Sequence, residues 1–209
     1  MPKRIYILTI LLLLTTLFVG CNKQAPSQSS REPLPDEYQK VVEKIEIKDR
    51  SNGQPTFSLN AEKLIEFADY AEFQKLGEII TYSEGKPEMK LTARKALWYD
   101  RQDKLVAIGD VLVKATEKDF RLDTPKLTYL IDGEKFESEG GSVVQTERYN
   151  LVADELKGDV KAKMLYAKGN MELKDHDGME IQGSSLEFNW ETEEYLIKGP
   201  IIVRIKTNN

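Results

Sequence analysis

The stretch FRLDTPKLTYLIDGEKFESEGGSVVQ, residues 120–145, carries the pattern that decides the fold. Apolar and polar side chains alternate along it, as Leu122 does with Asp123. Alternation with a period of two is typical of a β-strand that buries one face. The pair Asp132-Gly133 in its middle is typical of a tight hairpin turn. The stretch therefore predicts two antiparallel strands joined by a short turn.

The same pattern recurs with a period close to 30 residues along the second half of the chain. A small residue follows the leading strand of every unit and a glycine opens its last strand, and both markers are separated by 31, 29 and 30 residues. The small residues are Ala93, Thr124, Ala153 and Gly183, and the glycines are Gly109, Gly140, Gly169 and Gly199. A fixed period of this length is typical of stacked supersecondary units that cannot bury their apolar faces alone.

The body of the protein, from about residue 38 to residue 206, therefore predicts an all-β fold. Roughly a dozen or more short strands at this spacing favour a sandwich, a barrel or a jelly roll. Two segments, 38–45 and 64–73, could each hold a short helical turn. We expect a β-bulge at Gly140 and Gly141, where two glycines interrupt the alternation.

The N-terminus predicts export and attachment to a membrane. Two basic residues precede an uncharged run, residues 5–20, which is typical of an export signal. Cys21, the single cysteine of the chain, follows this run as it does in a bacterial lipobox, which predicts acylation of its thiol. The alternative is an incidental cysteine at the end of a signal or anchor helix, which the bulky Phe18 favours. We expect a signal peptide or membrane anchor (1–20), a flexible polar tether (21–37) and one folded domain (38–209).

Charge and chemistry exclude several classes of function. The 30 basic and 35 acidic residues are interspersed, so no basic stripe predicts a nucleic-acid partner. His176, the single histidine, lies in a predicted turn, and no nucleophile motif accompanies it. We therefore expect no catalytic residue, no metal site and no cofactor, and we predict that the protein is not an enzyme.

The alternation also predicts which side chains point inward. A row of inward apolar side chains either fills a closed core or lines a slot between two sheets. The residues assigned to the inward register are Leu97, Tyr99, Leu122, Tyr129, Phe136, Leu151, Met171, Ile181, Phe188 and Ile197.

The strand-and-glycine units resemble a known family. They read LVAIGDVLVK, FESEGGSVVQ, MLYAKGNMELK and YLIKGPIIV, and DRSNGQPTFSLNAEKL precedes them. Together with the N-terminal membrane segment, they resemble the periplasmic LptC family of lipopolysaccharide export, which shares its fold with LptA and OstA-type domains. The resemblance covers about residues 42–206.

The resemblance implies an open, twisted β-jelly roll whose apolar interior accepts acyl chains, so the inward residues would contact lipid. It also implies a relay at the periplasmic face of the inner membrane of a Gram-negative bacterium, held by lipid or by one N-terminal helix. Such a relay accepts lipopolysaccharide from an inner-membrane ABC transporter and passes it to an LptA-type bridge protein.

An open jelly roll leaves two terminal strands with unpaired backbone groups, and we expect these strands at 42–48 and 201–206. Ile201, Val203 and Ile205 would pair with the bridge protein by strand addition, and the other end would dock the transporter. Two rival functions stay open: a β-scaffold or adaptor lipoprotein of the cell envelope that binds no lipid, and a carbohydrate-active β-sandwich enzyme.

Overall fold

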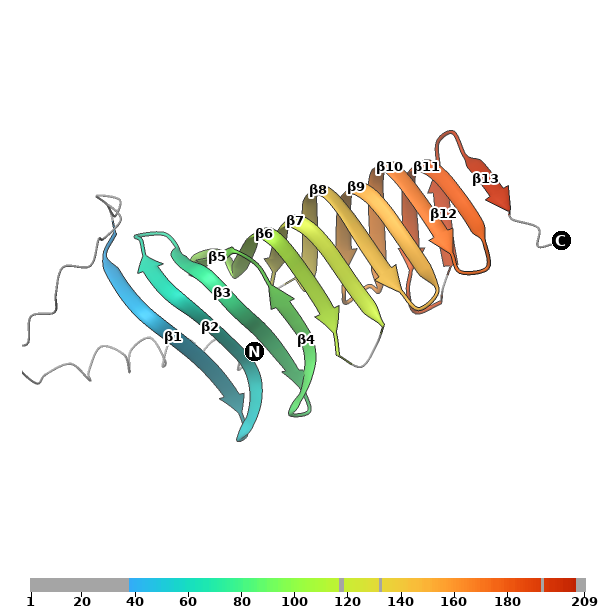
Figure 1. Cartoon of the computed structure of the whole chain (residues 1–209). Helices are drawn as coiled ribbons and strands as arrows, with labels where there is room; N and C mark the ends of the chain where they lie inside the picture. The colour runs from blue at the N-terminus through green and yellow to red at the C-terminus, as the bar shows by residue number, and fades with distance from the viewer. Residues whose placement is uncertain (1–37, 117–118, 132, 193, 206–209) are drawn as a thin grey trace, which may run out of the picture. The chain divides into compact units, whose positions relative to one another are not determined.

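Antiparallel strands make up most of the protein that the structure describes (Figure 1). The computed structural model describes residues 38–116, 119–131, 133–192 and 194–205, and its strands belong to one compact unit, Asp36–Asn209. The predicted anchor (1–20), the tether (21–37), Cys21 and the turn residue Asp132 lie outside the described residues. Within the described ranges, no helix is long and apolar enough to span a bilayer.

The strands form one 13-stranded sheet within these ranges, which confirms the predicted all-β fold. One 3-10 turn, Asp100–Gln102, interrupts them. The strands are β1 Lys40–Ser51, β2 Gln54–Glu66, β3 Ala71–Ser83, β4 Lys86–Thr92, β5 Lys95–Tyr99, β6 Lys104–Ala115, β7 Phe120–Leu130, β8 Lys135–Thr146, β9 Tyr149–Asp159, β10 Met164–Asp175, β11 Met179–Asn189, β12 Glu194–Lys198 and β13 Ile202–Ile205.

The suggestion of helical turns at 38–45 and 64–73 is wrong. The first segment lies mainly in β1, and the second joins β2 to β3 through a tight connection in which the Phe67 N–H donates to the Tyr70 carbonyl at 2.9 Å. Pairing with neighbouring strands overrides the weak local preference for helix in both places.

Neighbours in sequence are neighbours in the sheet. The order is β1-β2-β3-β4-β6-β7-β8-β9-β10-β11-β12, with β5 between β3 and β6 and with β13 beside β11. β4 and β5 thus act as two halves of one broken strand, and β12 and β13 act as another. Every pairing is antiparallel, as short hairpin connections require.

The longer strands bend near their middle, where the ladder shifts register. One shift lies between Glu139 and Ser142 of β8, and it confirms the bulge expected at Gly140 and Gly141. Both glycines have φ near +90°, in the left-handed region that side chains rarely adopt. The bulge inserts extra residues on one strand and turns the chain direction.

The two sequence markers of the repeat meet at these bends. Each of the four glycines lies against the side chain of the residue that directly follows one of the four small residues. A Cβ added to the glycine would contact that side chain. The pairs are Gly109 with Arg94, Gly140 with Pro125, Gly169 with Asp154 and Gly199 with Ser184. The bends therefore recur along the chain with the same period of about 30 residues as the sequence repeat.

The bends divide the sheet into two walls. We call wall A the half that contains β5 and β12, and wall B the half that contains β4 and β13; each longer strand runs through both. β1 lies at one end of the sheet and β12 with β13 at the other, and no further described strand pairs with either end. The sheet therefore stays open, as an open β-jelly roll does.

Candidate functional site

Unbroken rows of inward side chains cross the sheet on both walls. Cross-strand partners point to the same face, so the pairing register defines each row. The row on wall B is Ile47, Leu59, Ile79, Leu91, Val113, Leu122, Val144, Leu151, Leu173, Ile181 and Val203. The row on wall A is Val42, Leu64, Phe73, Ala96, Ala107, Leu127, Ser138, Leu156, Ala167, Leu186 and Ile197.

Most of the predicted slot residues lie on this inner face. Leu122, Leu151, Met171 and Ile181 are buried in the core cluster. Tyr129 pairs with Phe136, which packs against that cluster, and so shares its face. The predicted residues on the inner face are Leu122, Tyr129, Phe136, Leu151, Met171, Ile181, Phe188 and Ile197.

The assignment of Leu97 and Tyr99 to the inner face is wrong. Their neighbours Ala96 and Trp98 point inward instead, and Ala96 is fully buried. Because β4 ends and β5 begins at the bend, the alternation shifts there, and buried Ala93 and Ala96 stand three residues apart. Strict alternation continued from buried Ala93 across the bend therefore assigns Leu97 and Tyr99 to the inner face, although they lie on the outer face.

One aromatic contact joins wall A to wall B. The rings of Tyr149 in β9 and Phe188 in β11 meet edge to face, with centroids 6.1 Å apart. Their partners on the intervening strand β10 are Asp175 and Leu165, ten residues apart. At about 3.3 Å per residue, that separation is about 33 Å along a straight strand. The rings meet because the bends turn the two walls toward each other.

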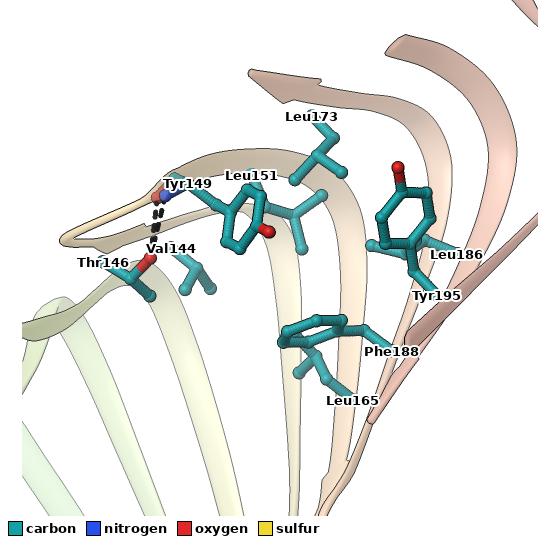
Figure 2. A pocket seen from close by; sticks show the side chains of 9 residues that line it. All are labelled: Val144, Thr146, Tyr149, Leu151, Leu165, Leu173, Leu186, Phe188 and Tyr195. Carbon is teal, nitrogen blue, oxygen red and sulfur yellow. Dashed lines mark hydrogen bonds between the residues drawn. The ribbon is translucent and has the colours of Figure 1, made fainter. Parts of the chain in front are cut away.

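A small apolar cleft lies beside this contact (Figure 2). Its volume is about 40 Å³. Figure 2 shows the lining side chains converging from both walls: Val144, Thr146, Tyr149, Leu151, Leu165, Leu173, Leu186, Phe188 and Tyr195. Sequence reasoning missed most of these residues. The repeat could have found Tyr149, which follows the inward Phe120 by one period of 29 residues.

A chain of buried hydroxyls crosses the inner face at the bend of β7, β8 and β9. The Leu156 N–H donates to Ser138 Oγ at 3.2 Å, and the Ser138 and Ser142 hydroxyls lie 2.6 Å apart. Ser142 Oγ donates to Thr124 Oγ1 at 3.0 Å, and Thr124 donates to the Lys126 carbonyl at 3.2 Å. Each hydroxyl thus accepts one hydrogen bond and donates one, so the polar groups are satisfied within an apolar surface.

Electrostatics agree with an apolar interior and a charged exterior. Burial raises the pKa of the Tyr129 hydroxyl on the inner face, and the carboxylates of Glu134 and Glu88 raise it further, so this phenol stays neutral. The outer face carries ion pairs such as Lys126 with Glu139, 2.9 Å apart. Among the described residues, no group of His, Cys, Asp and Glu side chains could hold a metal ion.

The predicted partner edge lies at the open end of the sheet. Val203 and Ile205 pair with Ile181 and Met179 of β11, and so continue the inner face to its last strand. Both are exposed, Ile205 to 71%, and Ile201, just before β13, is half exposed. An apolar edge of this kind is one that native proteins usually cover.

Comparisons with known proteins identify the family and the fold. The model of the family "Lipopolysaccharide-assembly, LptC-related" matches residues 8–172. Among solved structures, one match is the crystal structure of LptH, the LptA homologous periplasmic component of the conserved lipopolysaccharide transport device from Pseudomonas aeruginosa. It aligns with a TM-score of 0.52 and 14% identity over 57% of this chain and 95% of that chain, which shows a shared β-jelly roll. No curated protein matches the sequence at a significant level.

Proposed function

Because the chain belongs to the LptC-related family of lipopolysaccharide-assembly proteins, we propose that it carries lipopolysaccharide, with the acyl chains held between walls A and B. The observation that carries this proposal is the apolar row of wall B. It runs without interruption from Ile47 on the first strand to Val203 on the last. A continuous track offers an acyl chain an apolar side chain on every strand of wall B as it moves along the sheet.

Physical magnitudes support a carrier of this type. Each buried methylene contributes about 0.8 kcal/mol, so an acyl chain of a dozen carbons gains roughly 10 kcal/mol by entering an apolar slot. The sugar and phosphate groups stay in water. A relay must also release its cargo, so successive carriers bind it with similar strength and an energy source elsewhere sets the direction. The inner-membrane ABC transporter of the export system supplies that energy in this proposal.

The two ends of the sheet serve different partners in this proposal. The transporter's periplasmic domain docks at β1, and an LptA-type bridge protein adds a strand beside β12 and β13. The apolar and exposed Val203 and Ile205 support the second assignment. The protein is held at the periplasmic face of the inner membrane, through acylated Cys21 or through its N-terminal helix. Labelled fatty acid should enter the wild type but not a Cys21→Ser variant, and equal labelling of the two would exclude acylation of Cys21.

Photo-crosslinking with matched neighbours tests lipid binding. Leu151 and Val152 are adjacent and apolar, but Leu151 lies in the inner row while Val152 is 43% exposed on the outer face. A photoreactive side chain at residue 151 should label lipopolysaccharide, and one at residue 152 should not, because one step along a strand reverses the face. The corrected register predicts the same contrast between Trp98 and Leu97. Equal labelling at both members of each pair would contradict the proposal.

One observation favours the alternative, an adaptor that binds only proteins. The cleft of about 40 Å³ is much smaller than an acyl chain. If residues 98 and 151 label no lipid while Val203→Pro abolishes binding of the bridge protein, the adaptor function is correct.

A further inference from the structure

The contact between Tyr149 and Phe188 suggests how cargo gains access to the slot. We infer that these two rings form a latch that holds walls A and B together, and that acyl chains enter this part of the slot only when the latch opens. The inference rests on the proposed lipid-carrying function for its cargo. The latch itself is a property of the protein alone and is tested separately below.

The cleft beside the two rings is too small for an acyl chain while the rings stay in contact. The cleft beside the two rings has a volume of about 40 Å³. A cavity of about 150 Å³ accommodates one benzene ring, which has only six carbons. An acyl chain of a dozen carbons is larger than benzene and therefore exceeds the volume of this cleft. Close-packed interiors do not deform continuously, so the walls need a defined contact that breaks.

Each ring is held firmly by its own wall. Thr146 Oγ1 accepts the Tyr149 N–H at 2.9 Å and donates to the Tyr149 carbonyl at 3.3 Å, which fixes this residue at the turn between β8 and β9 (Figure 2). The Arg148 guanidinium lies 5.4 Å from the Tyr149 ring centroid. On the other wall, Phe188 pairs with Tyr195 and with Leu165. Because both rings are anchored within their strands, the walls cannot move apart at this point unless the two rings separate from each other.

The contact between the two rings lies where the walls can move furthest apart. Thr146 and Tyr149 lie at the tips of β8 and β9, whereas the bend of these strands lies at Gly140 and Ala153. Two walls joined at a bend open most at the ends away from it. A contact placed at the strand tips therefore controls the widest part of the opening, while the bend works as the hinge.

Thiol labelling measures opening without any lipid. The full-length chain carries Leu186→Cys, a buried cleft position, and a maleimide reagent reports how often this position becomes accessible. Peptide mass spectrometry separates its signal from that of Cys21. Tyr149→Leu and Phe188→Leu keep apolar bulk over the cleft but remove the edge-to-face contact. Each should speed labelling by about 2- to 12-fold, the range that corresponds to one aromatic pair.

Non-additivity distinguishes a latch from two separate packing residues. In a latch, either substitution alone breaks the contact, so the double variant labels no faster than the faster single variant. Multiplied effects, or unchanged labelling, would overturn the inference. Leu59→Cys, buried far along wall B in β2, is the control, and faster labelling there would mean that the whole fold loosens instead. If Leu186→Cys prevents folding, Leu173→Cys reports on the same cleft.

A lipid measurement then separates this inference from the proposed function. In stopped-flow mixing with a fluorescent palmitic acid, the latch predicts faster association for both leucine variants than for the wild type. Rings that merely contact the bound chain would change the dissociation rate and leave association unaltered, which would overturn the latch as a barrier to entry. If the wild type binds no palmitic acid and photoreactive side chains at residues 98 and 151 label no lipopolysaccharide, the lipid-carrying function fails, and the thiol-labelling rates still decide whether the latch exists.

Discussion

Substitution of the bend glycines should reveal how much of the stability depends on the bends. Gly141 and Gly169 both have positive φ, +89° and +74°. A Cβ on Gly141 would meet no atom within 4 Å, whereas a Cβ on Gly169 would lie 2.4 Å from Asp154 Oδ2. The pair therefore separates backbone strain from steric overlap within one kind of bend.

The expected magnitudes follow from these contacts. A non-glycine residue in the left-handed region costs about 1–2 kcal/mol, so Gly141→Ala should lower the free energy of unfolding by that amount. Gly169→Ala carries the same strain and must also displace the Asp154 carboxylate, which accepts a hydrogen bond from Asn170 Nδ2 at 2.8 Å. Loss of that bond adds about 1 kcal/mol, for a total of about 2–3 kcal/mol.

Urea unfolding of the full-length chain, followed by circular dichroism, measures both changes. In thermal unfolding, each kcal/mol corresponds to a shift of about 2–4 °C in Tm for a chain of this length. Adding Asp154→Ala to Gly169→Ala removes the nearest clash, so the double variant should recover part of the extra loss. Equal destabilisation at Gly141 and Gly169, with no recovery, would refute the assignment of overlap to Asp154.

Three other predictions concern the edge, the buried hydroxyls and pH. Val203→Pro should abolish binding of the bridge protein in a pull-down, while circular dichroism shows a folded body, because proline removes a backbone donor from the edge strand; unchanged affinity would contradict edge docking. Ser142→Ala breaks two buried hydrogen bonds and should cost about 1–3 kcal/mol in urea unfolding, so an unchanged midpoint would argue against the hydroxyl chain. The Arg121 guanidinium lowers the pKa of the Asp123 carboxyl, so this exposed pair stabilises the fold above the ordinary pKa of about 3.9 and loses its effect as the pH falls through the lowered value. Asp123→Asn should therefore cost less than about 1 kcal/mol at pH 7 and nothing in strong acid, and a cost that persists in acid would exclude the ion pair as its cause.

The strands and their bends could be predicted from the sequence because both depend on local patterns. Alternation marks the strands, and the glycine spacing marks the bends. The error at Leu97 and Tyr99 arose at a bend, where local alternation breaks. The repeat could have corrected this error. Leu127 and Tyr129 lie on the inner face, and the residues 31 positions before them are Ala96 and Trp98, which also point inward.

The contact between the walls could not be predicted in the same way. Tyr149 and Phe188 belong to strands that do not pair with each other, and their meeting depends on the angle at the bend. The hydroxyl chain likewise depends on three strands brought into register at one bulge. Alternation gives the face of a side chain, but it carries no information about what lies across the fold.

The arrangement of the sheet also determines how its number of strands can change. Because each strand pairs only with the strands beside it, and the two ends of the sheet do not pair with each other among the described residues, the fold has no closure condition. Inserting one unit of about 30 residues would add two strands and lengthen the track by about 10 Å, at about 4.8 Å per strand. Deleting one would shorten it equally, with the other bends left in place. The reach of such a protein across an aqueous gap can thus evolve by duplication of a single unit, in steps of fixed length.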